Sequence, residues 1–338
     1  MVYGGQKMKI KTIPIMMIVA VGVCSACWII NSVNKIIEKE DNSLSAESLM
    51  DIVPASETTP LETEPEIAEA EVRVLKKAAE PEKATKDDIF YMMLNSIDYY
   101  DKVSGRFVHK SARSEYYDEV VFQTWLSDTN AFSVYRSYYA TEDTDEEKIS
   151  SGTVETEQEY AQYCDGSSFI SVFPKTKNWE NISNSIISMD KVIDIPDQER
   201  MFTKEGMPGY AYKTNPTNVI MSNSCLFPQE YAFGFLQDQS LWDIAEITNY
   251  QGRKCYIING NTTPEYGAQM RVDTFEFIVD ANTGVLMRYD GYNENGELCD
   301  FMHTDNIKFE EESEPVEVLP DGILDEYTEQ KPNYYLVE

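Results

Sequence analysis

Aromatic residues divide the sequence into a part that can fold and a part that cannot. The chain has 14 Phe, 4 Trp and 22 Tyr, and all of them except Tyr3 and Trp28 lie at or beyond Phe90. Large apolar side chains supply most of the area that a core buries. We therefore expect one folded region, residues 86–309, and no packed core before it.

The charge balance excludes whole classes of partner. The chain has 28 Lys and Arg against 59 Asp and Glu, which gives a formal net charge of −31. Nucleic-acid binding needs cationic side chains that displace counterions from phosphates, so no nucleic-acid partner is expected. An acidic surface is also repelled by anionic lipid headgroups, and only the basic N-terminus escapes this repulsion.

An uncharged apolar run at residues 12–30 predicts an anchor in the cell membrane. At about 1.5 Å per residue, such a helix nearly spans the hydrocarbon core of a bilayer. Lys7, Lys9 and Lys11 precede the run, and the first acidic residue is Glu38. This asymmetry places residues 1–11 in the cytoplasm and everything after residue 30 outside it. The expected protein is single-pass, with an extracytoplasmic C-terminal domain.

Three other interpretations of the run stay open. A cleaved signal peptide could end after residues 20–22 or 23–25, where small residues stand at suitable offsets. A lipoprotein signal could use Cys27, which follows Ser25 and Ala26. Both place the rest of the chain outside the cytoplasm, as the anchor does. A buried helix of a soluble protein fits neither the length nor the flanking lysines.

Two acidic segments flank the expected domain. Residues 31–85 are rich in Glu, Ala, Ser, Thr and Pro, a composition typical of disorder, and predict a flexible linker with a reach of roughly 40 Å. Residues 310–338 predict a similarly solvated acidic tail. Tyr327, Tyr334 and Tyr335 indicate that part of this tail lies back on the domain.

The domain begins with a predicted helix. Thr85 and Asp88 form an approximate capping box, and Ser104-Gly105 is the expected end. Between them an apolar stripe recurs at helical spacing: Ile89, Met93, Ile97 and Tyr100. Such a helix can cover one face of a sheet.

Period-two alternation predicts strands in the rest of the domain, apart from loops and short helices at 181–240. Strands are expected at 119–126 and 131–139, and Asp165-Gly166 divides 160–173 into a hairpin. Five further strands are expected at 241–250, 253–259, 271–280, 285–292 and 297–309. Turns at 251–252, 282–284 and 295–296 join the first to the second, the third to the fourth and the fourth to the fifth. This pattern predicts a mainly β, α+β fold: a curved antiparallel sheet with one apolar face.

The sequence contains no motif of catalysis or metal binding. Only His109 and His303 are present, neither with a partner at ligand spacing, and the common catalytic and phosphate-binding motifs are missing. We expect a protein without enzymatic activity and without a cofactor or metal. Four cysteines lie in the exported part and can form disulfides in any of three pairings, or be plain core residues: Cys164, Cys225, Cys255 and Cys299.

Three segments carry a resemblance to a known family. They are WDIAE at 242–246, GRKCYII at 252–258 and FEFIVDANTGVLMR at 275–288. Their succession resembles the LolA-like superfamily, which includes lipoprotein carriers, lipoprotein-sorting proteins and RseB-type regulators. The hairpin at 164–170, followed by Pro174, also looks like that family, although Phe277 and Ile278 stand where the family often has Trp.

The resemblance implies an incomplete β-barrel, lidded by helices, whose concave side accepts an acyl chain. The function it implies is a membrane-tethered binding domain for a lipid, an acyl chain or a lipoprotein. The alternative is a regulatory or sensory protein that contacts a membrane or secreted protein. Two departures from the family are the tether, which a diffusible carrier lacks, and the missing room for the second domain of RseB-type regulators.

Apolar residues of the predicted strands are the candidates for lining the concave face. The same alternation is also what a packed core would produce. The six candidates are Phe122, Trp125, Phe132, Phe169, Val172 and Trp242.

Overall fold

The structure, a computed structural model, describes residues 73–181, 196–204, 207–217 and 221–330. The predicted membrane segment, most of the predicted linker and the end of the tail lie outside these ranges. Within them, no helix has the length and apolar character needed to cross a membrane. The end of the predicted linker contacts the domain, because Lys76 N–H donates to Asp98 and Ala78 and Ala84 pack against the core.

The first helix begins where the sequence predicts and ends earlier. Helix α2 spans Lys86–Leu94, and Thr85 and Asp88 form the expected capping box. The chain then makes a short 3-10 turn and enters strand β1, Lys102–Lys110, which was not predicted. The expected end at Ser104-Gly105 is therefore wrong. Gly105 lies within this strand, and its missing side chain leaves room for the Phe122 ring, since a Cβ at position 105 would come within 3.0 Å of that ring.

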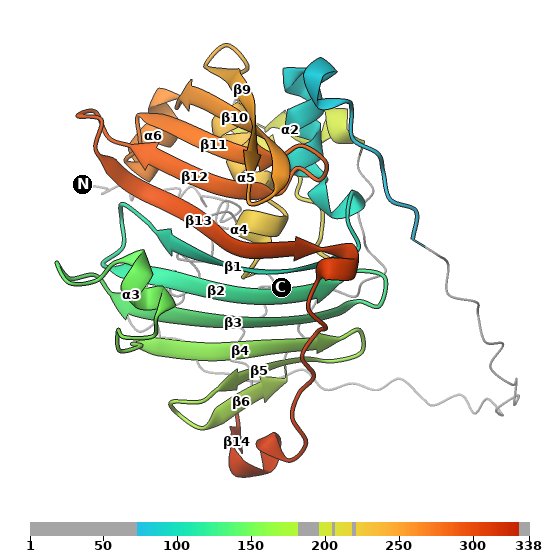
Figure 1. The fold of residues 1–338 in the computed structure, drawn as a ribbon, viewed down its shortest axis with the longest axis vertical. Coiled ribbons are helices and arrows are strands. Elements are labelled where there is room, and N and C mark those ends of the chain that lie inside the picture. The colour runs from blue at the N-terminus through green and yellow to red at the C-terminus, as the bar shows by residue number, and fades with distance from the viewer. Residues whose placement is uncertain (1–72, 182–195, 205–206, 218–220, 331–338) are drawn as a thin grey trace, which may run out of the picture.

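One large open sheet contains most of the strands and confirms the mainly β class (Figure 1). The order is β14-β6-β5-β4-β3-β2-β1-β13-β12-β11-β10-β9, antiparallel except between β14 and β6. The strands that follow β1 are β2 Tyr116–Trp125, β3 Asn130–Tyr139, β4 Gln158–Asp165, β5 Phe169–Phe173, β6 Asn178–Asn181, β9 Trp242–Tyr250, β10 Arg253–Asn261, β11 Thr274–Asp280, β12 Leu286–Tyr292, β13 Leu298–Phe309 and β14 Thr328–Glu329.

The predicted turns have the backbone geometry that tight reversals need. Gly252, Gly284 and Gly296 all have φ near +75°, the left-handed region that glycine adopts without a Cβ penalty. The pairing of β1 with β13 joins the two halves of the sheet, although almost two hundred residues separate them in sequence. This long-range pair is what makes a single sheet of two sequential meanders.

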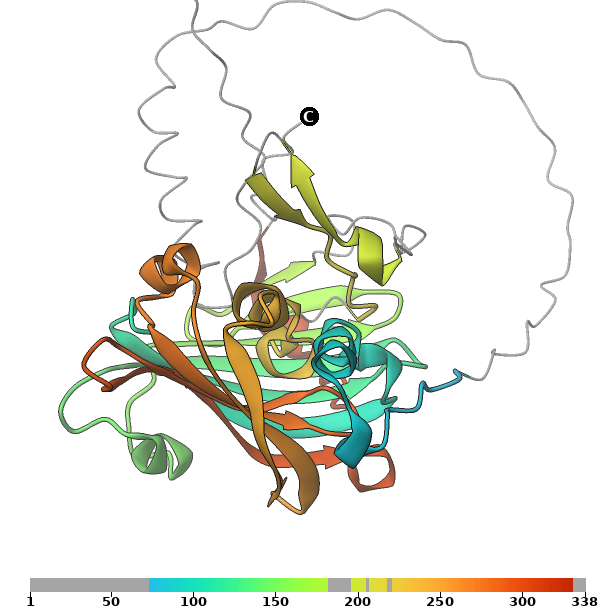
Figure 2. The same ribbon diagram turned by 90° about the horizontal axis from the view of Figure 1, so that it is seen from above.

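Helices cover one face of the sheet, which we call the inner face (Figure 2). The cover consists of α2, α4 Asn223–Leu226, α5 Gln229–Tyr231 and a π-helical turn, η6, at Ala232–Leu236. Helix α3, Glu146–Ser150, lies on the opposite, outer face. A short hairpin of β7 Met201–Lys204 and β8 Met207–Tyr210 forms a second sheet, and α6, Pro264–Met270, connects β10 to β11.

The C-terminal tail crosses the outer face instead of extending into solvent. After two 3-10 turns, η7 Glu310–Glu312 and η8 Ile323–Glu326, it reaches the edge of the sheet and adds β14 to β6 (Figure 1). Most side chains of residues 313–330 are exposed and none is buried, as expected of a solvated tail, yet the segment follows the surface of the sheet. The expectation that part of it lies on the domain holds for Tyr327, next to the residues paired with β6.

Candidate functional site

The six candidate lining residues lie on both faces of the sheet. Residues paired directly across antiparallel strands share a face. Phe122, Phe169 and Trp242 lie on the inner face, and Trp125, Phe132 and Val172 on the outer face. The two groups cannot line one cavity, because the backbone of the sheet separates them.

The inner three residues are packed tightly. Phe122 and Trp242 belong to the main core, and the Trp242 indole N–H donates to the Leu236 carbonyl at 2.9 Å. Phe169 packs with Ala131 and Cys164 in a smaller cluster. Their part in ligand binding remains a prediction.

The four cysteines of the domain are free thiols in the structure. Cys164, Cys225 and Cys255 are buried, and Cys299 is half-buried. Burial raises the pKa of the Cys255 thiol to about 12, so the thiolate needed for exchange is suppressed. The described domain is therefore held together without a disulfide.

An aromatic cluster fills the inner face beneath the π-helical turn. The Phe235 ring lies between 4.8 and 5.4 Å from the rings of Tyr266, Phe275, Phe277 and Tyr289. Gly234 permits this packing, because a Cβ at that position would stand 2.1 Å from the Tyr266 ring. This turn was not predicted, because it falls in the stretch 181–240, which has no clear periodicity.

A row of charged side chains continues along the inner face next to this cluster. Nδ1 of His109 lies 3.7 Å from Oδ2 of Asp118, and its Nε2 lies 3.6 Å from Oδ1 of Asp300. The side chains are 13%, 4% and 0% exposed, respectively. The Tyr135 hydroxyl donates to Asp118 at 2.5 Å, and the Ala112 N–H donates to Asp300 at 3.0 Å.

The pairing of distant strands explains why sequence reasoning missed this row. His109 of β1 pairs with Asp118 of β2, and Asp300 comes from β13 on the other side of β1. The sequence separation between His109 and Asp300 hides their proximity until the β1–β13 pair is known. In the described ranges no group of three or more such side chains is arranged to hold a metal ion.

Tyr289 connects the aromatic cluster to the charged row. Its ring contacts Tyr231, Phe235 and Phe277 at 5.1 to 5.6 Å. Its hydroxyl is buried and lacks a hydrogen-bond partner among the described residues. Burial raises the pKa of Tyr289 well above its usual value, and the nearby Asp300 carboxylate adds to this effect. The side chain of Tyr289 thus extends from the aromatic cluster to the charged row.

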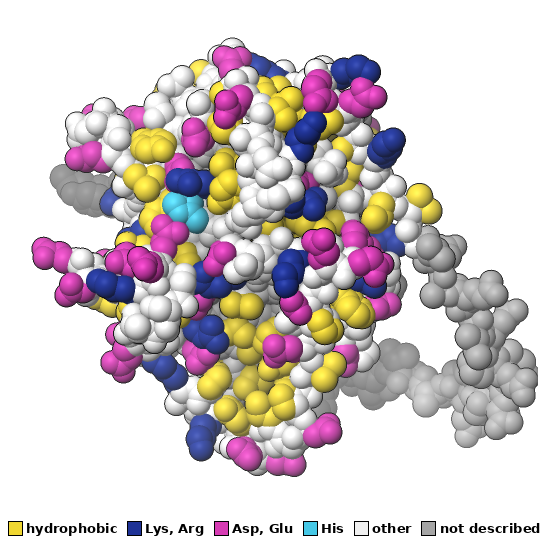
Figure 3. All heavy atoms as spheres, in the orientation of Figure 1, with side chains coloured by type: hydrophobic (Ala, Val, Ile, Leu, Met, Phe, Trp, Pro, Cys, Tyr) yellow, Lys and Arg dark blue, Asp and Glu magenta, His cyan; other side chains and the backbone are white. Residues whose placement is uncertain are grey.

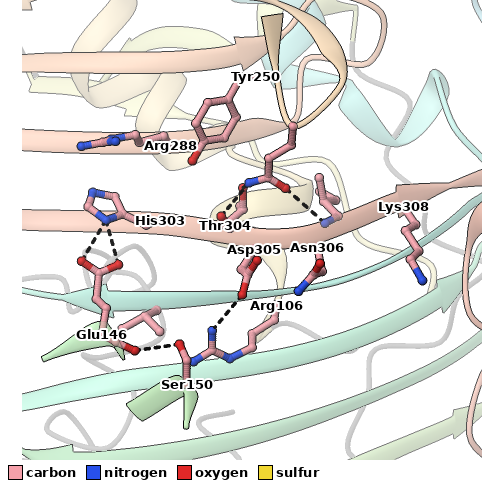
Figure 4. Close-up of a pocket in the computed structure, with 13 residues that line it drawn as sticks. Arg106, Glu146, Ser150, Tyr250, Arg288, His303, Thr304, Asp305, Asn306 and Lys308 are labelled. Carbon is pink, nitrogen blue, oxygen red and sulfur yellow. Dashed lines mark hydrogen bonds and ion pairs between the residues drawn. The ribbon is translucent and has the colours of Figure 1, made fainter. Parts of the chain in front are cut away.

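The outer face carries a polar groove of about 650 Å³ between α3, β13 and the β9–β10 turn (Figure 4). His303 lies in it between two carboxylates: Nε2 is 2.6 Å from Asp290 and Nδ1 is 2.9 Å from Glu146. Burial alone would lower the pKa of His303, but hydrogen bonds to Asp290 and Glu146 outweigh burial and raise it. This contact attaches α3 to the sheet.

A second polar pocket, of about 500 Å³, lies at the end of α2. Its buried Arg200 donates to the carbonyls of Leu94 and Ala211 and to the side chain of Asn95. Lys213 forms an ion pair with Asp98 at 2.5 Å. Since these polar groups bond to one another and to main-chain carbonyls, the pocket joins the end of α2 to the segment 197–213.

The sequence matches no protein-family model and no curated protein. Several solved structures have a distantly similar fold. A chain of the Pseudomonas aeruginosa MucA/MucB complex is 14% identical with a TM-score of 0.31, over 71% of this chain and 68% of that one. LprF from Mycobacterium bovis is 9% identical with a TM-score of 0.32, over 70% and 100%. A LolA superfamily protein from Nitrosomonas europaea is 8% identical with a TM-score of 0.22, over 71% and 97%.

Proposed function

We propose that this chain is a membrane-tethered extracytoplasmic domain that binds an amphiphile such as a lipid on its inner face. The apolar part of the ligand would lie against the aromatic cluster, and its polar head would reach the row of His109, Asp118 and Asp300. The observation that carries the proposal is the junction at Tyr289, where aromatic packing meets buried charge.

The cover of the inner face supports binding of an apolar chain. Apart from α2, it is made of α4, α5 and the π-helical turn, with four, three and five residues. Helices this short are marginal by themselves and depend on tertiary packing, and π-helical turns occur often at functional sites. A small outward movement of this cover would expose Phe275, Phe277 and Tyr289 as an apolar groove.

The charged row supports recognition of a head group that donates hydrogen bonds. Carboxylate oxygens accept hydrogen bonds, and Oδ1 of Asp300 is buried without a hydrogen-bond partner among the described residues. An amine or hydroxyl head group suits this arrangement better than a phosphate or a carboxylate does. The protein would act by holding this ligand and not by changing it.

A comparison of two Asp-to-Asn variants tests this proposal. The full chain is titrated with a fluorescent alkylamine and with a fatty acid of equal length. Asp300→Asn should weaken alkylamine binding about ten-fold, as expected for one hydrogen bond to a charged group. Asp305→Asn is the control, because Asp305 lies in the outer groove with a side chain 53% exposed. Equal binding by the two variants, or no binding by the native chain, would contradict the proposal.

A further inference from the structure

The outer face of strands β2–β5 is apolar, unlike the groove beside it. Hydrophobic side chains gather on it in the lower part of Figure 3. Strand pairing identifies those that share this face: Val121, Trp125, Phe132, Val134, Tyr163, Ile170 and Val172. A one-layer sheet with such a face needs a cover, and here the inner helices cannot supply it.

The C-terminal tail crosses this face. We call residues 313–330 the strap. Its path is fixed where the Glu314 N–H donates to Ser104 at 2.9 Å and the Glu317 N–H donates to Gln123 at 2.7 Å. Burial raises the pKa of Tyr163, and Glu317 and Tyr327 of the strap add to this effect. The strap ends with Thr328 and Glu329 paired with Asn178 and Trp179.

The attachment of the strap is weak for its length. Its pairing with β6 spans two residues, and both hydrogen bonds from Glu314 and Glu317 go to side chains rather than to a strand backbone. Val318 is 81% exposed, so the strap does not bury all of its own apolar side chains. Segments with few backbone hydrogen bonds and few buried contacts open at the lowest free-energy cost.

The hinge of the strap is also strained. Glu310, where β13 ends, has φ of +50°, a left-handed conformation that side chains other than glycine rarely adopt. The Asp101 N–H donates to its carboxylate at 2.9 Å and holds it there.

We propose that the outer face of β2–β5 is a docking surface for an extended segment of a partner protein, and that the strap occupies this surface until the partner displaces it. The strap itself shows the chemistry that fits: acidic residues such as Glu314 and Glu317 are interspersed with Val316, Val318 and Leu319, and no Lys or Arg lies among them. Lys308 pairs with Glu314 at 2.5 Å, and Lys102 lies over the Trp125 ring at the same face. The partner segment would combine acidic and apolar residues and would add as a strand to the edge of β6 that β14 now occupies.

This inference is independent of ligand binding on the inner face, and competition with a synthetic peptide tests it. The probe is a fluorescent peptide with the sequence of residues 313–330. On the native full chain the attached strap competes at an effective concentration on the order of mM, so the peptide should bind weakly. Glu317→Pro removes the N–H that donates to Gln123 and should tighten peptide binding several-fold. Val318→Pro is the matched control, because the Val318 N–H donates no hydrogen bond within the described residues, and it should bind as the native chain does.

A chain that ends at Glu312 provides the second variant and should bind the peptide at least about ten-fold more tightly than the native chain. The far-ultraviolet circular dichroism spectrum checks that the shortened chain folds. If it does not fold, the test is the comparison of peptide binding by Glu317→Pro and by the native chain. Absence of peptide binding in every folded variant would overturn the proposal. Dimers of the native chain that dissociate on addition of the peptide would instead identify a second copy as the occupant and would also overturn it.

Discussion

A single half-buried carboxyl group shows how strongly the inner face affects ionisation. Glu230, in α5, lies next to the aromatic cluster, and burial raises its pKa to about 7. In the unfolded chain a glutamate titrates near 4.3. Between these values the native state binds more protons than the unfolded state, so this residue makes stability fall as pH rises toward 7.

Replacing this carboxyl group should therefore stabilise the protein at neutral and higher pH. Glu230→Gln should increase the free energy of unfolding by about 1 to 3 kcal/mol at pH 8, and the gain should vanish near pH 4. Denaturant unfolding at the two pH values measures this. Glu265→Gln, on the exposed surface of α6, should change little at either pH. A loss of stability in Glu230→Gln at pH 8 would show that the carboxylate has a partner.

For His303, in contrast to Glu230, the charged form should stabilise the folded protein. Its folded pKa is raised, so the stability it contributes is fully present below its unfolded pKa of about 6.5 and is lost as pH rises through the folded value. His303→Gln should destabilise the protein at pH 5.5 and have little effect at pH 9. Thermal melts at both pH values test this. Glu146→Gln removes one of the two carboxylates that contact His303 and should show a smaller effect of the same sign. A deficit of equal size at pH 9 would mean that packing on Phe301, not charge, makes the contribution.

At the scale of elements, the π-helical turn depends on one missing side chain. Gly234→Ala would place a Cβ against the Tyr266 ring and should cost about 1 to 3 kcal/mol of unfolding free energy. Shortening the neighbour in the double variant Gly234→Ala with Tyr266→Leu should make the two effects non-additive. Urea unfolding of both single variants and the double variant measures this coupling. Additive losses would mean that the turn shifts to accommodate the methyl group.

The elements that local patterns specify were the ones the sequence could predict. The capping box of Thr85 and Asp88 and the glycine turns at 252, 284 and 296 depend on neighbouring residues only. Strand β1 was missed because Ser104-Gly105 looks like a helix end. The glycine instead makes room for the ring of Phe122, which lies on the neighbouring strand β2. The charged row of the inner face was missed for a related reason: it exists only once β1 pairs with β13.

The candidate residues show the limit of alternation as a signal. Period two places residues an odd number of positions apart on opposite faces of one strand, yet it cannot say which face of one strand continues that of the next. Phe132 was therefore grouped with Phe122, although strand register places the two on opposite sides of the sheet. Trp125 was also grouped with Phe122, although the two stand three positions apart in β2 and alternation alone separates them. Both faces carry apolar residues: helices cover the inner face, and the strap crosses the outer one.

At the scale of the whole molecule, the location of the domain is a prediction that rests on the N-terminal segment. The charge asymmetry around residues 12–30 predicts that the domain lies outside the cytoplasmic membrane. Protease added to intact cells without a wall should remove the domain and leave a short membrane-bound fragment. Survival of the domain until the membrane is lysed would place it in the cytoplasm.

Native mass spectrometry of the full chain, purified from its own membranes, tests amphiphile binding by the inner face most directly. The protein should carry a co-purified amphiphile with an amine or hydroxyl head group, and Asp300→Asn should lose it while Asp305→Asn keeps it. Retention by both variants would place the ligand elsewhere on the molecule. A mass equal to that of the protein alone, with no uptake of added alkylamine, would contradict binding of an amphiphile by this face.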